Sequence, residues 1–358
     1  MIKFITFIAT FLVFAFGSAN ADPKKVGFIY IGPPGDHGWT YMHDVGRKYM
    51  ESQLGDSITS TYIENVPENA DAVRAIRKLA DSGHDLIFTT SFNYMDQTHE
   101  VAKDFPDVKF EHATGYIQAD NVATYSARFY EGRMIEGHIA GHMSKTGTIG
   151  YIASFPIPEV VRGINAFYLA AAKVNPDIKM KIIWVFTWYD PGKEADAANT
   201  LINQGADIIV QHTDTYAPCQ AAQKAGVFAF GQASNQEEFC PDAHLTSIED
   251  IWGPYYADRA KAVVDGTWSS GDTWDGMDKG MVVMSPYNTK LMPASLIQEA
   301  VNMEVGIKDG TLHPFTGPIY NQAGELVVPD GEVAPDGMLL GMNFYVCLLY
   351  TSPSPRDT

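Results

Sequence analysis

The sequence predicts an α/β fold made of two Rossmann-like lobes. Short, β-rich apolar runs alternate with amphipathic helical segments, first over 26–112 and again after 129. This alternation is typical of parallel sheets, because parallel strands need crossovers and helices cover both faces. The chain has 358 residues, enough for two cores. No Pro/Ser-rich linker separates the two series, so we expect a hinge of crossing strands.

The first series predicts four strands and three helices. The run 26–31 is apolar throughout, as in a strand buried on both faces, and a Gly/Pro loop follows it. In the segment 70–82, Ala72, Ile76 and Leu79 fall on one helical face. The expected strands are 26–31, 59–63, 86–90 and 109–112, and the expected helices are 41–52, 70–82 and 95–105.

The second series follows an expected helix at 129–144 and repeats the rhythm. Its expected strands are 148–153, 179–186, 208–212 and 227–230, and its helices are 159–174, 195–204 and 219–225. The segment 245–265 predicts a further strand and helix, and 294–307 predicts a helix before an irregular Gly/Pro-rich end. We therefore assign 22–126 with 247–283 to lobe 1, and 127–246 with 284–346 to lobe 2.

The first 21 residues have the pattern of a secretory signal peptide. Lys3 precedes the apolar run 4–16, and the small residues Ala19 and Ala21 fit a signal-peptidase site. The run is shorter than the roughly 20 residues of a spanning helix. No cysteine stands at the cleavage point, so we expect export to the periplasm, cleavage after Ala21 and no lipid anchor.

Three cysteines allow one disulfide in an oxidising compartment. Cys219 and Cys240 bracket a helix-strand-loop segment and are the expected pair, with two separate thiols as the alternative. Cys347 opens the stretch 347–358, where the composition changes abruptly and becomes rich in Ser and Pro. We interpret 347–358 as a non-native or frameshifted tail; an ordinary frayed terminus is the alternative.

Charge excludes two classes of partner. The formal net charge is −18 at pH 7, and the basic residues are scattered without a Lys/Arg run. Attraction to nucleic acid or to an anionic membrane is therefore disfavoured.

The common catalytic and cofactor signatures are missing. Gly32, Gly35 and Gly38 match neither a dinucleotide fingerprint nor a P-loop, and Pro33 and Pro34 remove backbone donors that a phosphate would need. There is no G-x-S-x-G elbow and no C-x-x-C. The many acidic residues allow a glycosidase pair, but none stands out. We expect no cofactor and no enzymatic activity.

His138 and His142 lie four residues apart on an expected helix and could face one metal ion. The sequence between them lacks the Glu of the H-E-x-x-H signature. Most such pairs are solvated or packed, so we predict no metal site.

An aromatic residue recurs beside a polar residue in loops just beyond strands. The candidates are Asp36 with Trp39, Phe92 with Asn93, Phe155, Trp188, Asp214, and Asp250 with Trp252. Each one alone fits a core or rim position. Their repetition at equivalent edges of both series indicates a flat ligand between the lobes, stacked on rings and hydrogen-bonded at its rim.

Four segments together resemble the basic membrane protein family of ABC-transporter substrate-binding proteins. They are GPPGDHGW at 32–39, FYEG at 129–132 continuing to GHIAG at 137–141, GTIG at 147–150 and PFTGPI at 314–319. The resemblance covers about 26–346. It implies the type I periplasmic-binding fold, a purine in a cleft between the lobes, and delivery to a membrane permease with its ATPase. Many relatives are lipoproteins, and this chain departs from them.

Carried over by position, the family's aspartate after the first strand corresponds to Asp36. Its nearby aromatic corresponds to Trp39, and the aromatic after its third strand to Phe92. Trp188 and Asp214 sit in loops that face the cleft in such a fold.

The same resemblance predicts a free purine base, such as adenine, over a nucleoside. Nucleoside-binding relatives hold ribose with a lysine after a Thr-Ser strand end and an aspartate in an earlier loop. Here the acids at 249–250 stand where the lysine is expected, and Ala233 stands where the aspartate is expected. We expect Asp250 to accept N–H groups of the base, with Trp252 over the space left by ribose. The alternative is that Asp250 only caps a helix beginning near Trp252.

We predict a monomeric periplasmic binding protein that captures a purine for ABC import. A sugar or autoinducer is the alternative ligand in the same fold, because aromatic rings also stack on sugars. A secreted hydrolase acting in the cleft is the alternative from another class.

Overall fold

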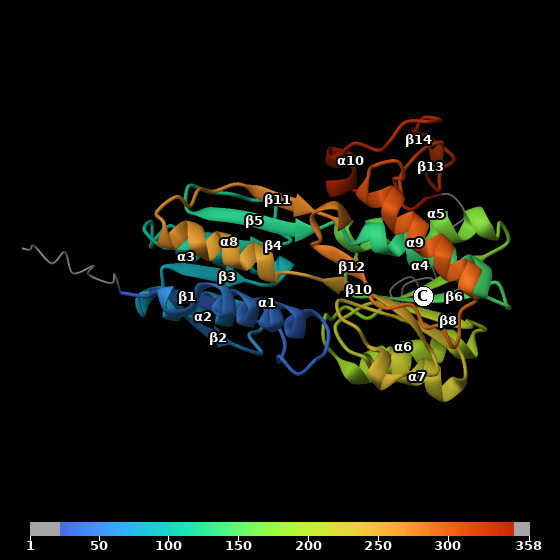
Figure 1. Cartoon of the computed structure of the whole chain (residues 1–358), viewed down its shortest axis with the longest axis horizontal. Helices are drawn as coiled ribbons and strands as arrows, with labels where there is room; N and C mark the ends of the chain where they lie inside the picture. The colour runs from blue at the N-terminus through green and yellow to red at the C-terminus, as the bar shows by residue number, and fades with distance from the viewer. Residues whose placement is uncertain (1–21, 347–358) are drawn as a thin grey trace, which may run out of the picture.

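A computed structural model describes residues 22–346. The expected signal peptide (1–21) and tail (347–358) therefore lie outside the described residues. Two α/β lobes lie side by side along the long axis of the molecule (Figure 1). No helix among the described residues combines the length and the apolar character needed to cross a bilayer.

Lobe 1 is built on a sheet of six parallel strands in the order β2-β1-β3-β4-β5-β11. The strands are β1 (Lys24–Ile29), β2 (Ile58–Ile63), β3 (Leu86–Thr89), β4 (Lys109–Ala113), β5 (Val122–Ala127) and β11 (Asp272–Asp275). The helices are α1 (Trp39–Leu54), α2 (Ala70–Asp81), α3 (Met95–Ala102) and α8 (Gly253–Val264), with 3-10 turns η1 (Gly55–Ser57) and η2 (Phe92–Tyr94). Helix α1 packs on α8 and α2 packs on α3, in separate core clusters, so both faces of the sheet are covered.

Lobe 2 repeats this plan with the order β7-β6-β8-β9-β10-β12, in which only β12 is antiparallel to its neighbour. Its strands are β6 (Thr148–Ala153), β7 (Lys179–Trp184), β8 (Ile208–His212), β9 (Phe228–Gly231), β10 (His244–Asp250) and β12 (Val282–Met284). Its helices are α4 (Tyr130–Met143), α5 (Pro158–Val174), α6 (Pro191–Asn203), α7 (Ala217–Ala225) and α9 (Ala294–Lys308), with η3 (Glu237–Phe239). Helices α4, α5 and α9 pack together, and α6 packs on α7.

A small C-terminal unit covers α5. It contains the hairpin β13 (Ile319–Tyr320) and β14 (Leu326–Val328) and the helix α10 (Asp336–Leu340). Buried Arg162 of α5 donates to the Leu339 carbonyl at 2.6 Å. Hydrogen bonds across this contact therefore attach the unit to lobe 2.

The chain crosses between the lobes three times: after β5, after β10, and through η4 (Met277–Lys279) between β11 and β12. Neighbouring crossings are joined by backbone bonds from Arg128 N to Asp275 O and from Ile251 N to Met281 O, both 2.9 Å. The expected hinge of crossing strands is the observed connection. Figure 1 shows the consequence, since α8 and β11 lie among the N-terminal elements of lobe 1.

Sheet membership changes where the chain is best divided. Strand β10 pairs with β9 and β12, so a boundary at 246/247 would cut it, and one at 283/284 would cut β12. We therefore place the divisions after 127, 250 and 281. The sequence pattern could not locate them, because the hydrogen-bond partners that assign a strand to a sheet lie far along the chain. Strands β5, β11 and β12 were not expected from the sequence.

Candidate functional site

A cavity lies where the two sheets face each other. Its lining comes from both lobes: Ile31, Trp39, Ser91, Phe92 and Thr114 from lobe 1, and Glu159, Trp188, His212, Asp214 and Gln232 from lobe 2.

Topology explains why these residues meet. In each lobe the strand order reverses between the first and third strands, and ligands of such sheets bind outside the carboxyl ends at that point. Trp39 and Phe92 follow β1 and β3, on either side of the switch point of lobe 1. Glu159 and Asp214 follow β6 and β8, on either side of the switch point of lobe 2.

The aromatic walls are held in place from behind. The indole Nε1 of Trp39 donates to the Thr90 carbonyl at 2.7 Å, and its ring meets that of His43 edge-on, with centroids 4.4 Å apart. Trp188 packs against Phe155, with ring centroids 5.2 Å apart. The cavity therefore presents fixed rings from both lobes to a flat ligand.

The polar rim offers acceptors and donors without protein partners. Asp214 is buried, and its Oδ2 has no hydrogen-bond partner among residues 22–346; the same holds for Trp188 Nε1 and His212 Nδ1. Burial, with the Asp36 carboxylate nearby, raises the pKa of Asp214 well above its usual range. The Nε2 atom of His212 lies 3.3 Å from Glu159 Oε1, while burial lowers the pKa of the His212 ring.

Gln232 is oriented by a charge buried behind the cavity. The Gln232 Oε1 atom accepts from Arg133 Nη2, which also donates to the Gln211 carbonyl at 2.6 Å. Arg133 Nη1 also forms an ion pair with Glu136 Oε2, 2.7 Å away. Arg133 is therefore a positioning residue, and the Gln232 amide is available to the cavity.

Asp36 does not line the cavity but closes the N-terminus of α1. Its carboxylate accepts from the backbone N–H groups of Gly38, Thr40 and Tyr41 at 2.9, 3.0 and 2.9 Å. Burial nevertheless raises the pKa of Asp36 to about 6. Asp36 was predicted as a ligand contact, and the structure instead shows its carboxylate satisfying N–H groups at the start of α1, where side-chain acceptors are favoured.

Asn93 and Phe155 also lie outside the cavity lining. Asn93 Nδ2 donates to Glu68 Oε2 at 2.9 Å, so it fixes the loop after β3. Phe155 supports Trp188 from the side. Both were predicted as ligand contacts, and the structure shows each touching protein neighbours.

Asp250 and Trp252 are fully buried near the hinge and are not among the lining residues. Trp252 stacks on His43 with centroids 5.0 Å apart and planes 9° apart, and it meets Trp39 edge-on. Both carboxylate oxygens of Asp250 lack partners among the described residues, and its side chain makes no cap bond at α8. Burial, together with nearby Glu159, raises the pKa of Asp250 well above its usual range.

A wider groove of about 530 Å³ adjoins the cavity, sharing Phe92, Thr114 and Glu159 with it. Arg162 and Trp274 line its far side, with the Arg162 guanidinium 4.8 Å from the centre of the Trp274 ring. This groove is the space available to any substituent that projects from a ligand in the cavity.

The lobes touch on the other side of the cavity. The Ser234 hydroxyl donates to the His37 carbonyl, and the His37 ring meets the Phe239 ring with centroids 4.7 Å apart. Tyr216 stacks on Phe239 at 3.9 Å. The structure is therefore a closed form.

Four of the predicted residues, Trp39, Phe92, Trp188 and Asp214, meet in the cavity. Sequence reasoning missed Glu159, His212 and Gln232. His212 ends β8, and Gln232 directly follows β9. Polar residues at the carboxyl ends of strands were therefore the signal that could have found them.

Comparisons with known proteins agree with this architecture. The model of the family described as ABC transporter substrate-binding protein PnrA-like matches residues 23–311. A purine-binding protein of Brucella abortus is 59% identical over 331 residues, covering 92% of this chain and 94% of that protein. A putative ABC transporter glucose-binding protein of Haloferax volcanii is 36% identical, covering 82% of this chain and 74% of that protein.

Among solved structures, a solute-binding protein of an ABC transporter system from Aeropyrum pernix superposes with a TM-score of 0.71 at 20% identity. The match covers 81% of this chain and 93% of that chain. It shows the fold, two parallel-sheet lobes of the type I periplasmic-binding kind.

Proposed function

This chain belongs to the PnrA-like family of ABC transporter substrate-binding proteins, and from that premise we propose that it binds a purine between its lobes. The family consists of substrate-binding transport proteins and not of enzymes. Such proteins bind small ligands and work with a membrane permease and its ATPase. The proposed cargo sits in the cavity between Trp39, Phe92 and Trp188.

The observation that carries the proposal is the combination of aromatic walls from both lobes with the unpaired Asp214 carboxylate oxygen. A purine has two faces for stacking and N–H groups and ring nitrogens at its edge. Asp214 would accept an N–H, and the Trp188 Nε1–H would donate to a ring nitrogen. The 59% identity to a purine-binding protein supports this ligand class.

We propose that the ligand is a free base and not a nucleoside. Glu249, near the place of the expected ribose-binding lysine, accepts from Ser285 Oγ at 2.6 Å, and Ala233 has no polar side-chain atom. Buried sugar hydroxyls without partners would cost roughly 1–3 kcal/mol each. We propose that Asp250, which is buried behind the cavity lining with both carboxylate oxygens unpaired, accepts from the base through a bridging water.

Calorimetry with adenine, adenosine and glucose tests the proposal. We expect adenine to bind most tightly, and Asp250→Ala to weaken adenine more than adenosine. Tighter binding of adenosine would overturn the free-base assignment and would place the ribose in the adjoining groove. Binding of glucose alone would overturn the purine assignment in favour of a sugar, the ligand named for the 36%-identical relative.

We propose that the protein acts in the periplasm as a monomer, after cleavage at Ala21. The signal-like pattern of 1–21 supports this location. Mass spectrometry of the secreted protein should find Asp22 at the N-terminus, and light scattering should give the monomer mass. A retained leader or a stable dimer would contradict these two assignments.

A further inference from the structure

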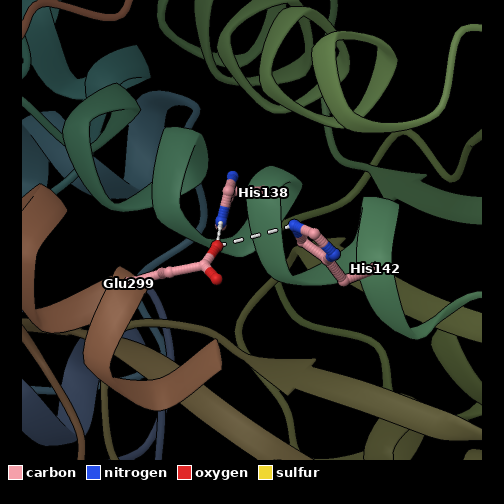
Figure 2. A group of neighbouring side chains, drawn as sticks. All are labelled: His138, His142 and Glu299. Carbon is pink, nitrogen blue, oxygen red and sulfur yellow. Dashed lines mark hydrogen bonds and ion pairs between the residues drawn. The ribbon is translucent and has the colours of Figure 1, made fainter. Parts of the chain in front are cut away.

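Two helices of lobe 2 bring three metal-binding side chains together on the surface (Figure 2). His138 and His142 stand one turn apart on α4, and Glu299 projects toward them from α9. His138 is partly exposed, and His142 and Glu299 are exposed. Within residues 22–346, this is the one group of three or more His, Cys, Asp or Glu side chains placed so that they could hold an ion.

The distances match those of a tetrahedral metal site. Glu299 Oε2 lies 2.9 Å from His138 Nε2 and 3.7 Å from His142 Nε2. With metal bonds of about 2.0–2.1 Å, ligand atoms at the corners of a tetrahedron lie roughly 3.3 Å apart. The two measured distances bracket this value. One donor atom from each residue falls within 4.8 Å of the others, so small rotations of exposed side chains bring all three onto one ion.

The donor set is also chemically suited to zinc. Two imidazoles separated by one helical turn form a recurring chelate, and a carboxylate is a common third ligand with water in the fourth position. We propose that His138, His142 and Glu299 bind one Zn²⁺ ion and clamp α9 to α4. This proposal revises the expectation from the sequence that the histidine pair holds no metal. The third ligand, Glu299, lies 161 residues from His138 along the chain, so no local sequence motif could include it.

An ion pair alone is a weaker account of the arrangement. A surface pair between a protonated histidine and a carboxylate contributes little. Such an ion pair also needs only one histidine, whereas here the Glu299 Oε2 atom faces two histidine rings. None of the three residues lines the cavity, so zinc binding is expected to be independent of the purine.

The test uses the full untagged chain and Zn²⁺ in competition with a chromophoric chelator. We expect one saturable site, and a melting temperature that rises with Zn²⁺ concentration because the ion binds only the folded state. His138→Ala and Glu299→Gln should each weaken Zn²⁺ binding by about tenfold or more, since even outer partners of metal ligands are worth 10–100-fold. Adenine affinity should stay unchanged in both variants.

The matched control is His99→Ala, which removes a histidine of α3 whose Nε2 lies 2.8 Å from the Ile117 carbonyl. It should leave Zn²⁺ binding intact. No saturable Zn²⁺ binding by the wild type, or undiminished binding by the folded His138→Ala/His142→Ala double variant, would overturn the proposal. Circular dichroism of each variant establishes that it is folded.

Discussion

At the scale of single residues, the buried acid Asp214 lowers the folding stability of the ligand-free protein. Asp214 is buried with an unpaired oxygen, and burial raises its pKa well above the usual range. An acid whose pKa is raised in the folded state contributes stability in full below its unfolded-state pKa, and loses it as the pH rises through the folded-state pKa. A ligand N–H facing Asp214 would offset this cost.

Asp214→Asn should therefore separate stability from binding. Without ligand, the variant should melt higher than the wild type at pH 8, and the difference should shrink toward pH 4, near the ordinary pKa of Asp. Its purine affinity should fall by about 0.5–1.5 kcal/mol, the usual net worth of a hydrogen bond. Thermal melts at both pH values and calorimetry check this. Asp36 and Asp250 also have raised pKa values. Both are present in the wild type and in Asp214→Asn, so they do not contribute to the difference between the two melting temperatures. Unchanged affinity, or a lower melting temperature at pH 8, would contradict the assigned role.

The stacking residues give a second test at this scale. Phe92→Ala and Trp188→Ala should each weaken purine binding by about 1–3 kcal/mol, judged by base–aromatic stacking elsewhere. Both side chains are only partly buried, so the variants should remain folded. Tyr320→Ala, which removes an exposed ring of the C-terminal hairpin, is the control. Full affinity in both cavity variants would show that these rings form the rim and do not hold the ligand.

At the scale of elements, a disulfide shapes the lobe 2 side of the closed contact. Cys219 of α7 is bonded to Cys240, which directly follows η3, so the expected pairing is confirmed. The bond joins the segments that carry Tyr216 and Phe239, whose stacked rings meet His37 of the other lobe. The same disulfide therefore constrains the fold of lobe 2 and holds the two rings that contact lobe 1.

The two cysteines are 21 residues apart. Replacing both by serine should lower the free energy of unfolding by about 3 kcal/mol, the value that the chain-entropy model gives for a loop of this length. Urea unfolding under non-reducing conditions measures the change. Cys347→Ser, which removes the third cysteine, is the control and should unfold like the wild type. A double variant as stable as the wild type would show that packing around α7 alone holds this segment.

At the scale of the whole molecule, one glycine governs how closely the lobes approach. A Cβ atom at Gly38, in the lobe 1 loop before α1, would overlap the Asp214 carbonyl oxygen of lobe 2. Binding between two lobes requires them to close around the ligand. The contact at Gly38 therefore belongs to the closed form and not to either lobe alone.

Gly38→Ala should hold the lobes apart. We expect purine affinity to fall at least tenfold with little change in lobe stability, and solution scattering to show less compaction on adding purine than in the wild type. Gly35→Ala is the matched control, because a Cβ at Gly35 in the same loop meets no atom within 4 Å. Wild-type affinity and compaction in Gly38→Ala would show that the loops can shift without cost.

The sequence by itself determined the two-lobed α/β plan and much of the cavity. Hydrophobic periodicity is a local property, so it located β1, β3 and β8, and with them Trp39 and Asp214, which follow the carboxyl ends of β1 and β8. Only the tertiary structure decided that β10 belongs wholly to lobe 2, because hydrogen-bond partners assign a strand to its sheet. It also showed that His138 meets Glu299. Side-chain direction and contacts between distant segments follow from packing, which no local pattern encodes.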